Sequence, residues 1–123
     1  MCNPFRACLV VFCLICGLFL AACDDDSVDH NPPAGMGSLV IYNRTGDDIR
    51  VFIDGGQLQN AGDYDETIYD LQPGVHRMVL DQEDGDRSFA EYVDVFEGRL
   101  TEVLVETDFS NLHNYVVSFT IEE

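Results

Sequence analysis

The stretch Ser38–Ile53 reads SLVIYNRTGDDIRVFI and decides the fold class of this chain. In its second half, Ile49, Val51 and Ile53 recur at every other position, which is the spacing of a strand with one buried face. β-branched and aromatic residues dominate both halves, and the polar segment Asn43–Asp47 between them contains residues that turns prefer. The stretch therefore predicts two β-strands joined by a turn.

The same alternation continues toward the C-terminus. Further strands are expected at Thr67–Leu71, Val75–Leu80, Ser88–Phe96, Leu100–Glu106 and Tyr115–Ile121. Gly, Pro and Asp separate these runs, and no stretch carries an apolar stripe with the helical period of about 3.6 residues. Short strands spaced about 8–12 residues apart predict an all-β fold, a single antiparallel β-sandwich of about seven strands over residues 37–123.

The charge of the chain is strongly negative. It has 123 residues with 23 Asp plus Glu against six Arg and no Lys. Arg6 is the only charged residue before Asp24, so the chain from there on has 23 acids against five Arg, a formal charge of −18. Such a surface repels phosphate backbones and anionic lipid, so nucleic acid is not an expected partner. The absence of Lys excludes Schiff-base and P-loop chemistry.

The N-terminus has the parts of an export signal. Met1–Arg6 carries one positive charge, and Ala7–Leu20 is an unbroken apolar run that ends in small residues. This order is that of a secretory signal peptide over residues 1–22, which is removed from the mature protein.

The junction Leu20-Ala21-Ala22-Cys23 resembles the lipobox of bacterial lipoproteins. The resemblance implies that Leu20, Ala21 and Ala22 direct cleavage and that the Cys23 thiol carries a diacylglycerol, with fatty acyl chains that bind the membrane. The alternative is an uncleaved transmembrane anchor over residues 7–23, which is at the lower limit of a bilayer span.

Cysteine usage agrees with processing at this junction. Four of the five cysteines lie in the leader, so the mature chain keeps Cys23 alone. An exported protein with one cysteine has neither an internal disulfide nor a cysteine-based metal site. The domain must therefore be stable through its apolar core.

An acidic, proline-containing segment follows the cysteine. Residues 23–36 are expected to be the lipidated cysteine and a flexible, disordered linker in which His30 is solvated. The acids after Cys23 resemble a signal for the cell surface in one bacterial phylum, whereas Asp24 resembles an inner-membrane retention signal of enteric bacteria. The outer membrane or cell surface is the favoured location, and the inner membrane is the alternative.

Four pieces of the domain occur in the order of a known family. Gly37–Ile41 matches an opening Gly-x-Leu-x-Val, and Val51–Gly55 matches a strand that closes in Asp-Gly. Leu71–Leu80 matches Leu-x-x-Gly-x-His-x-Val-x-Val, and Val93–Gly98 matches Val-x-Val-x-x-Gly. In this order the chain resembles the PEGA-type domain of bacterial envelope and surface-layer-like proteins.

The chain departs from that pattern in two places. The Gly-x-x-Pro that gives the family its name is missing from Gln57–Glu66, and the strand Tyr115–Ile121 lies beyond the usual end. A broader carbohydrate-binding-like sandwich is similar to the chain as well. The resemblance implies a non-catalytic envelope module without a cofactor.

No sequence motif for catalysis is present. His76 alternates with Met78 and Leu80, so we expect it to face inward as a hydrogen-bonded core residue. His113 lies in a loop without another His or Cys at the spacing of metal ligands, so we expect a structural role for it.

The acidic loop Asp81–Asp86 is the one candidate for a cation site. Asp81, Glu83, Asp84 and Asp86 could supply oxygens to Ca²⁺. An EF-hand loop starting at Asp81 would need Gly at position 86 and Glu at position 92, and the chain has neither. A solvated hairpin tip without metal is therefore the favoured interpretation.

Aromatic side chains on the strands and loops could stack on sugar rings. The candidates are Tyr42, Phe52, Tyr64 and Tyr92, for which packing against the sheets is the alternative role. The sequence thus predicts a lipid-anchored, non-catalytic module that binds or organises a protein or glycan of the cell envelope. A Ca²⁺-stabilised adhesion domain and a small hydrolase are the alternatives.

Overall fold

The computed structural model describes residues 28–122 of the chain. These residues form eight β-strands and no helix. The strands are β1 (Gly37–Arg44), β2 (Ile49–Ile53), β3 (Gly56–Gln57), β4 (Glu66–Leu71), β5 (Gly74–Gln82), β6 (Ser88–Val95), β7 (Leu100–Thr107) and β8 (Tyr115–Ile121). The expected all-β class is confirmed, and all strands except β3 lie within two residues of their expected bounds.

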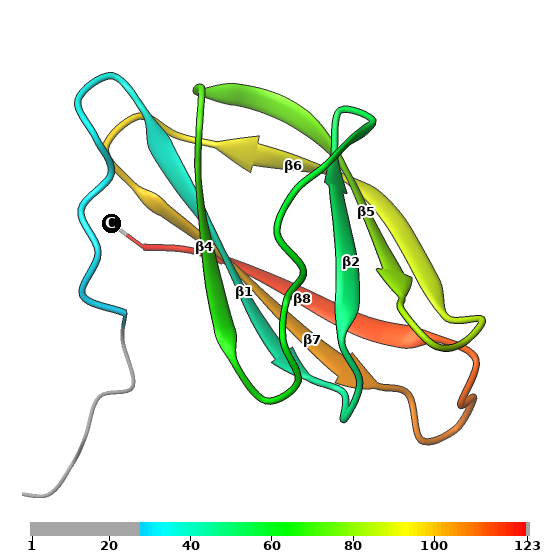
Figure 1. Cartoon of the computed structure of the whole chain (residues 1–123). Coiled ribbons are helices and arrows are strands. Elements are labelled where there is room, and N and C mark those ends of the chain that lie inside the picture. The colour runs from blue at the N-terminus through cyan, green and yellow to red at the C-terminus, as the bar shows by residue number, and fades with distance from the viewer. Residues whose placement is uncertain (1–27, 123) are drawn as a thin grey trace, which may run out of the picture.

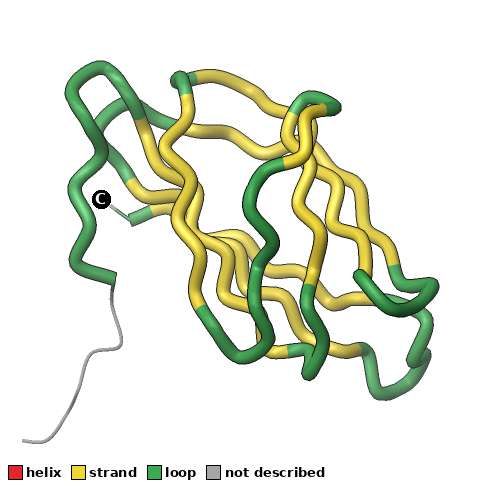
Figure 2. Tube along the Cα trace, viewed as in Figure 1, coloured by secondary structure: helices red, strands yellow, loops and turns green. Residues whose placement is uncertain are grey.

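The strands form two sheets of four. Sheet A has the order β4-β1-β7-β8, and sheet B has the order β3-β2-β5-β6. The sheets lie one over the other as two layers (Figure 1), and loops join the strand ends (Figure 2). Because β1 and β2 belong to different sheets, the turn that follows Arg44 carries the chain from one layer to the other.

One strand pair differs from the expected antiparallel arrangement. β1 pairs antiparallel with β4 but parallel with β7, with Ser38 opposite Leu100 and Arg44 opposite Glu106. Parallel neighbours need a long crossover connection, which the intervening strands provide here. The alternation of apolar residues is the same in both kinds of pair, so the sequence pattern did not show this direction.

β1 is buried on both of its faces. Leu39, Val40 and Ile41 have no exposed surface, although neighbouring side chains of a strand point to opposite sides. Leu39 and Ile41 belong to the core between the sheets, together with Val51, Leu80 and other residues. This double burial explains why the stretch that opens the domain reads as a continuous apolar run instead of a strict alternation.

The hairpin between β2 and β3 depends on two residues with positive φ. Asp54 has φ of 52° and Gly55 has φ of 83°, the combination of a type I′ turn. The turn places Gly56 opposite Ile53. A two-residue strand has no room for an alternation, so β3 could not be recognised in the sequence.

The segment before β1 differs from the expected flexible linker where the structure describes it. The imidazole Nε2 of His30 lies 2.9 Å from a carboxylate oxygen of Asp70 on β4. The Gly98 N–H donates to the Met36 carbonyl at 2.9 Å. Residues 28–36 therefore lie against the end of sheet A and loop over into β1 (Figure 1).

The core between the layers opens at the edge formed by β6 and β8. β8 pairs with β7 so that Phe119 and Ile121 lie on the same face as the buried residues Val103 and Thr101. Phe119 is nevertheless 41% exposed and Ile121 43% exposed. Phe89 on β6 reaches the Phe119 ring at a centroid distance of 6.4 Å, so contact across this edge is made by long side chains.

Gly37 gives a direct test of how closely the layers approach. A Cβ atom at this position would lie 2.2 Å from the Phe96 carbonyl oxygen and 2.7 Å from Val95 Cγ1. Because the nearest atom belongs to the backbone, we expect Gly37→Ala to lower the free energy of unfolding by about 1–3 kcal/mol. Urea unfolding of the variant and the wild type measures the change.

Gly56→Ala is the matched control. A Cβ there would meet its nearest heavy atom, the Ile53 carbonyl oxygen, at 3.5 Å, which is an ordinary contact. We expect its urea midpoint to stay close to that of the wild type. Equal midpoints for the two alanine variants would contradict the close approach at Gly37.

Candidate binding surface

The outward side of sheet B presents a row of apolar and cationic side chains. Phe52 lies opposite Val79, Val79 opposite Ala90, and Arg77 opposite Tyr92. The residues between them, such as Met78 and Leu80, are buried in the core, so these five point away from it. We call the surface formed by Phe52, Arg77, Val79, Ala90 and Tyr92 the binding face.

A shallow hollow lies at one end of the binding face. Arg77, Ala90, Glu91 and Tyr92 line it, and its volume is about 330 Å³. Tyr92 is 65% exposed, so much of its side chain is accessible to a ligand. A tyrosine ring can stack on the apolar side of a sugar or on another planar group, and a guanidinium can bind a carboxylate or phosphate with two hydrogen bonds.

The two arginines on this side of sheet B differ in their partners. Arg50 forms an ion pair with Asp81, directly opposite on β5. Among residues 28–122, no hydrogen bond or ion pair holds the guanidinium of Arg77. Arg77 is therefore available to a ligand, whereas Arg50 is held in place by its own sheet.

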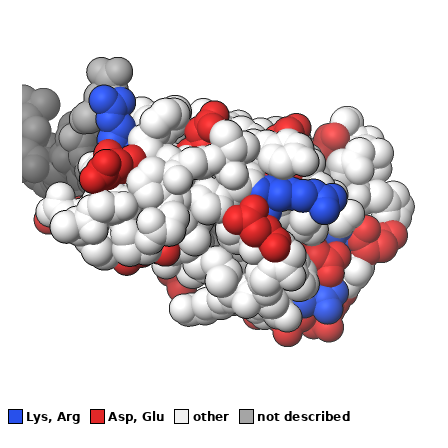
Figure 3. Space-filling view, turned by 90° about the horizontal axis from the view of Figure 1, so that it is seen from above, with Lys and Arg blue, Asp and Glu red and all other residues white. Residues whose placement is uncertain are grey.

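Basic side chains are few on this chain. Acidic side chains lie in several separate places over the face shown in Figure 3, with few basic ones among them. With 23 acids against six arginines, most anionic ligands are repelled at a distance. An anionic group reaching the hollow would depend on short-range contact with Arg77.

The four Ca²⁺ candidates do not converge. Asp81 is engaged by Arg50, the Glu83 carboxylate lies 3.4 Å from the Asn60 amide, and Asp86 lies 3.1 Å from His113 Nδ1. Within the described part of the chain, no group of three or more His, Cys, Asp or Glu is arranged to hold a metal. Three of the four side chains thus have separate partners, and no contact brings Asp84 together with them.

His76 is hydrogen-bonded, as expected, but it lies at the rim of the sandwich. Its Nδ1 lies 2.7 Å from Asp54 Oδ2, and its Nε2 lies 2.6 Å from the Gln72 carbonyl oxygen. Burial pulls the pKa of His76 down, but the Gln72 carbonyl and the Asp54 carboxylate outweigh this and raise it above 6.5. The backbone N–H of Arg77, followed by His76, lowers the pKa of Asp54. His76 therefore clamps the β2–β3 turn to β5.

His113 lies in the exposed loop between β7 and β8. Its contact is with Asp86 in the β5–β6 loop, and both side chains are about three-quarters exposed. Arg87 ties the same two loops together, since its Nε donates to the Leu112 carbonyl and its Nη1 donates to Thr107 Oγ1 at 3.1 Å. These contacts agree with a structural role for His113.

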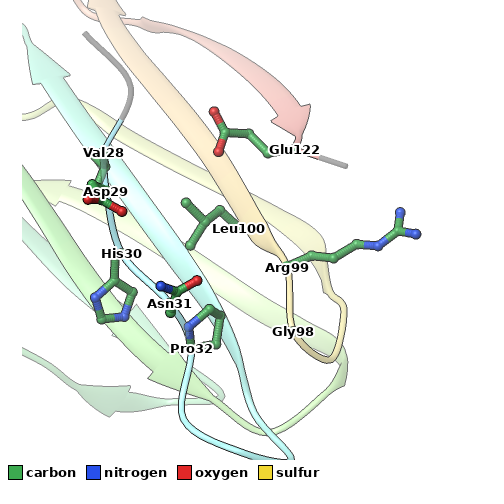
Figure 4. Close-up of a pocket in the computed structure, with 9 residues that line it drawn as sticks. All are labelled: Val28, Asp29, His30, Asn31, Pro32, Gly98, Arg99, Leu100 and Glu122. Atoms are coloured by element: carbon green, nitrogen blue, oxygen red, sulfur yellow. The ribbon is translucent and has the colours of Figure 1, made fainter. Parts of the chain in front are cut away.

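A second hollow, of about 260 Å³, lies between the segment before β1 and the start of β7. Figure 4 shows the side chains around it. Its lining includes His30 and Asn31 on one side and Arg99, Leu100 and Glu122 on the other. Ser38 and His30 both hydrogen-bond to Asp70, and the Ser38 hydroxyl, followed by His30, lowers the pKa of this carboxyl group. The expectation that His30 is a solvated linker residue is therefore wrong.

The other aromatic candidates lie in different settings. Tyr42 is half-buried and donates its hydroxyl to Glu102 at 2.8 Å, and burial followed by this carboxylate raises its pKa. Tyr64 is 66% exposed in the loop before β4, where its carbonyl accepts from Arg44 Nη1 at the end of β1. Of the four aromatics, Phe52 and Tyr92 are the ones that share a surface.

The predicted lipobox and lipidation site come before the first residue that the structure describes. Leu20, Ala21, Ala22 and Cys23 lie outside the described residues. The described residues include no helix with the length and apolar character that a bilayer crossing requires.

Comparisons with known proteins define the fold alone. No family model matches the sequence, and no curated protein matches it. The N-terminal domain of AlgF from P. aeruginosa superposes with a TM-score of 0.54 at 13% identity, covering 74% of this chain and 98% of that one. A protein from Eubacterium rectale has a TM-score of 0.47 at 16% identity, covering 68% and 88%. The AlgF domain shows that this β architecture is shared.

Arg77 is the residue of the binding face that sequence reasoning missed. Its position on the polar side of β5 was visible, and so was that of Tyr92 on β6. Their adjacency depends on the register of the two strands, which pairs Arg77 with Tyr92. Register is set by the whole core and the turn, so no local signal in the sequence could have joined them.

The His76 clamp predicts a pH dependence of stability. Because the pKa of His76 is raised in the folded state, its contribution is fully present below its ordinary value of 6.5 and is lost as pH rises through the folded value. The lowered pKa of Asp54 keeps that carboxylate charged down to below 3.8. The melting temperature of the wild type should therefore exceed that of His76→Gln by a margin that is at least about 2 °C larger near pH 5.5 than near pH 8.5.

Thermal unfolding at the two pH values measures this difference. His113→Gln is the matched control, because that imidazole is exposed and its loop contact is with an exposed carboxylate. If His76→Gln lowers the melting temperature by the same amount at both pH values, the charged pair does not stabilise the turn.

Proposed function

We propose that the mature chain begins at Cys23 and is a lipid-anchored, non-catalytic module of the bacterial cell envelope that binds a protein or glycan partner through the binding face. The observation that carries the anchor is the Leu20-Ala21-Ala22-Cys23 junction after an apolar run and before an abrupt acidic stretch. The fold supports the binding role, since its described part offers exposed sheet surface and shallow hollows.

The charge of the domain supports an apolar anchor over electrostatic attachment. A chain with a formal charge of −18 after the leader is repelled by anionic headgroups, so electrostatics cannot hold it to a membrane. Acyl chains bind through apolar burial, at about 0.8 kcal/mol per CH₂ group, and two or more of them give stable attachment. The outer membrane or cell surface is the proposed location, with the inner membrane as the alternative that Asp24 raises.

The path of residues 28–36 supports a short connection between the domain and the proposed anchor. Residues 28–36 lie against sheet A, so the four residues 24–27 separate Cys23 from Val28. The five Cα–Cα steps from Cys23 to Val28 reach at most about 18 Å when fully extended. The domain would then sit near the membrane surface, and the binding face, on the outer side of sheet B, would be turned away from the sheet to which the anchor leads.

The chemistry of the binding face favours a ligand with a planar or apolar ring surface and a negative or polar group. Tyr92 offers a ring, the Phe52–Val79–Ala90 row offers apolar contact, and Arg77 offers an unpaired guanidinium. Both glycans and protein segments carry such groups. The hollow has one carboxylate, that of Glu91, which supports binding and not acid–base hydrolysis by a carboxylate pair.

Cys23→Ser tests the anchor. In the wild type we expect a mature polypeptide that lacks residues 1–22, carries acyl chains and partitions into detergent. The serine variant lacks the thiol that forms the thioether, so we expect complete loss of the acyl mass and of detergent partitioning. Mass spectrometry of protein from membrane fractions measures both.

Cys16→Ser is the control, because that cysteine lies in the leader and should not change the mature product. An intact leader with an unmodified Cys23 in the wild type would refute the anchor, and the binding face would remain as a separate question.

Site-specific photocrosslinking tests the binding face. We expect a benzophenone side chain placed at Tyr92 in intact cells to give a discrete adduct, and we expect Arg77→Ala in the same chain to reduce its yield at least about fivefold, as for loss of a charge-assisted hydrogen bond. Gel mobility and mass spectrometry identify the adduct as protein or glycan.

Tyr64 provides the matched control, since it is 66% exposed against 65% for Tyr92 but lies outside the binding face. Equal adducts from both positions would indicate random collisions at exposed tyrosines and would count against the binding face.

A further inference from the structure

β8 is unusual among the strands because it carries no charge. Its sequence is YVVSFTI, whereas every other strand of five or more residues has at least one Arg, Asp or Glu. β8 is also the edge of sheet A. Charged side chains, prolines and short lengths are the usual means by which an edge strand avoids pairing with another chain, and β8, which is seven residues long, has none of them.

Apolar side chains of β8 are exposed on both of its faces. Phe119 and Ile121 point toward the core side and remain over 40% exposed, and Val116 on the opposite side is also 43% exposed. The reason is the open edge between β6 and β8, where sheet B does not cover the end of sheet A. An added strand would continue sheet A and cover these side chains.

Hydrogen bonds at the two ends of β8 show which of its backbone groups point away from β7. The Glu122 N–H donates to the Leu100 carbonyl at 3.0 Å. At the other end, the Asn114 carbonyl accepts from the Asp108 N–H at 3.3 Å. Bonded residues alternate in an antiparallel pair, so the even-numbered residues of β8 turn their N–H and C=O groups toward β7. The groups that point outward belong to Tyr115, Val117, Phe119 and Ile121.

We propose that β8 is a self-association edge, at which two copies of this chain pair antiparallel about a two-fold axis through Ser118. In this register the numbers of two opposing residues add up to 236, so Tyr115 lies opposite Ile121 and Ser118 lies opposite its own equivalent. All seven residues of β8 are then paired. Sheet A then continues across both copies. The outward N–H and C=O groups of the odd-numbered residues meet one another and form eight backbone hydrogen bonds.

The order of side chains along β8 fits this register. Tyr115 meets Ile121 of the second copy, and Val117 meets Phe119 of the second copy. Pairs of an aromatic and a β-branched side chain are among the favourable cross-strand pairs. On the other face, Val116 meets Thr120 of the second copy, and Ser118 meets its own equivalent. Small side chains at the axis let the two strands approach.

Charge restricts where a second copy of this chain can make contact. Two copies with a formal charge of −18 after the leader repel each other over most of their surface, so contact is possible where acids are absent. In this register no acidic residue lies opposite another acidic residue within β8. Just beyond the ends of β8, Asn114 lies opposite Glu122 of the second copy. A shift by one residue would place core-side residues opposite outward ones.

Single cysteines test the register in cells that produce the full chain. Ser118 and its equivalent form a non-hydrogen-bonded pair, with Cα atoms about 4.5 Å apart, which a disulfide can span. We expect Ser118→Cys to give a disulfide-linked dimer after a mild oxidant is added, seen on a non-reducing gel as a band absent from the wild type. The oxidant makes the result independent of the redox state of the cellular compartment. If the lipid anchor is wrong and Cys23 keeps a free thiol, the wild type contains that thiol as well, so the comparison with the wild type still isolates position 118.

Two flanking variants serve as matched controls. Val116→Cys and Thr120→Cys each lie opposite a different residue, so each alone should give at least about tenfold less dimer, because their Cα atoms lie beyond the span of a disulfide. Produced together from two genes, they should form the mixed disulfide between positions 116 and 120. All three positions are exposed and outward, so the variants keep the core intact.

The proposal fails if Ser118→Cys gives no dimer beyond the wild type while the protein accumulates normally. It also fails if the exposed loop variant Ser110→Cys gives as much dimer, or if Ser118→Cys links mainly to a different protein, which would make β8 a docking edge for another chain.

Discussion

The burial of β1 on both faces is the constraint on which the rest of the molecule depends. Leu39, Val40 and Ile41 have no exposed surface, and β1 holds β4 on one side and β7 on the other. Residues 28–122 contain no cysteine, so no disulfide within them can stabilise the sandwich. A strong negative charge opposes compaction through self-repulsion. Burial of β1 at the centre of sheet A must offset the self-repulsion without the help of a disulfide. Its position between β4 and β7 also affects which strands become edges.

The edges and outer faces of the sandwich then take different roles. β3 is two residues long, and β4 and β6 carry acids, so these edges are protected against pairing. β8 is long, uncharged and only partly covered. The outer side of sheet B combines an unpaired arginine with an exposed tyrosine, while the outer side of sheet A receives the segment that leads from the proposed lipid site. The proposed partner surface and the proposed anchor would thus lie on opposite sides of this small acidic domain.

Much of the local structure was predictable, and the reasons for the errors are specific. Seven strands were found from alternation, because half-buried strands impose a period of two on the sequence. His76 was expected to be hydrogen-bonded, but its rim position beside Asp54 follows from the β2–β3 turn. His30 was expected to be solvated in a flexible linker, because nothing in a polar, proline-containing segment shows that Asp70 lies within reach. The parallel direction of β1 and β7 was not visible because apolar residues alternate in the same way in parallel and antiparallel pairs.

The sequence by itself determined where the strands lie, which of their residues face inward and how strongly the surface is charged, because these depend on side chains within a few residues of each other. The tertiary structure alone decided which strands are neighbours and in what direction and register they pair. Backbone hydrogen-bonding groups are the same in every strand, so selection among partners falls to the packing of the complete core. That selection placed Arg77 beside Tyr92 and left β8 at an edge.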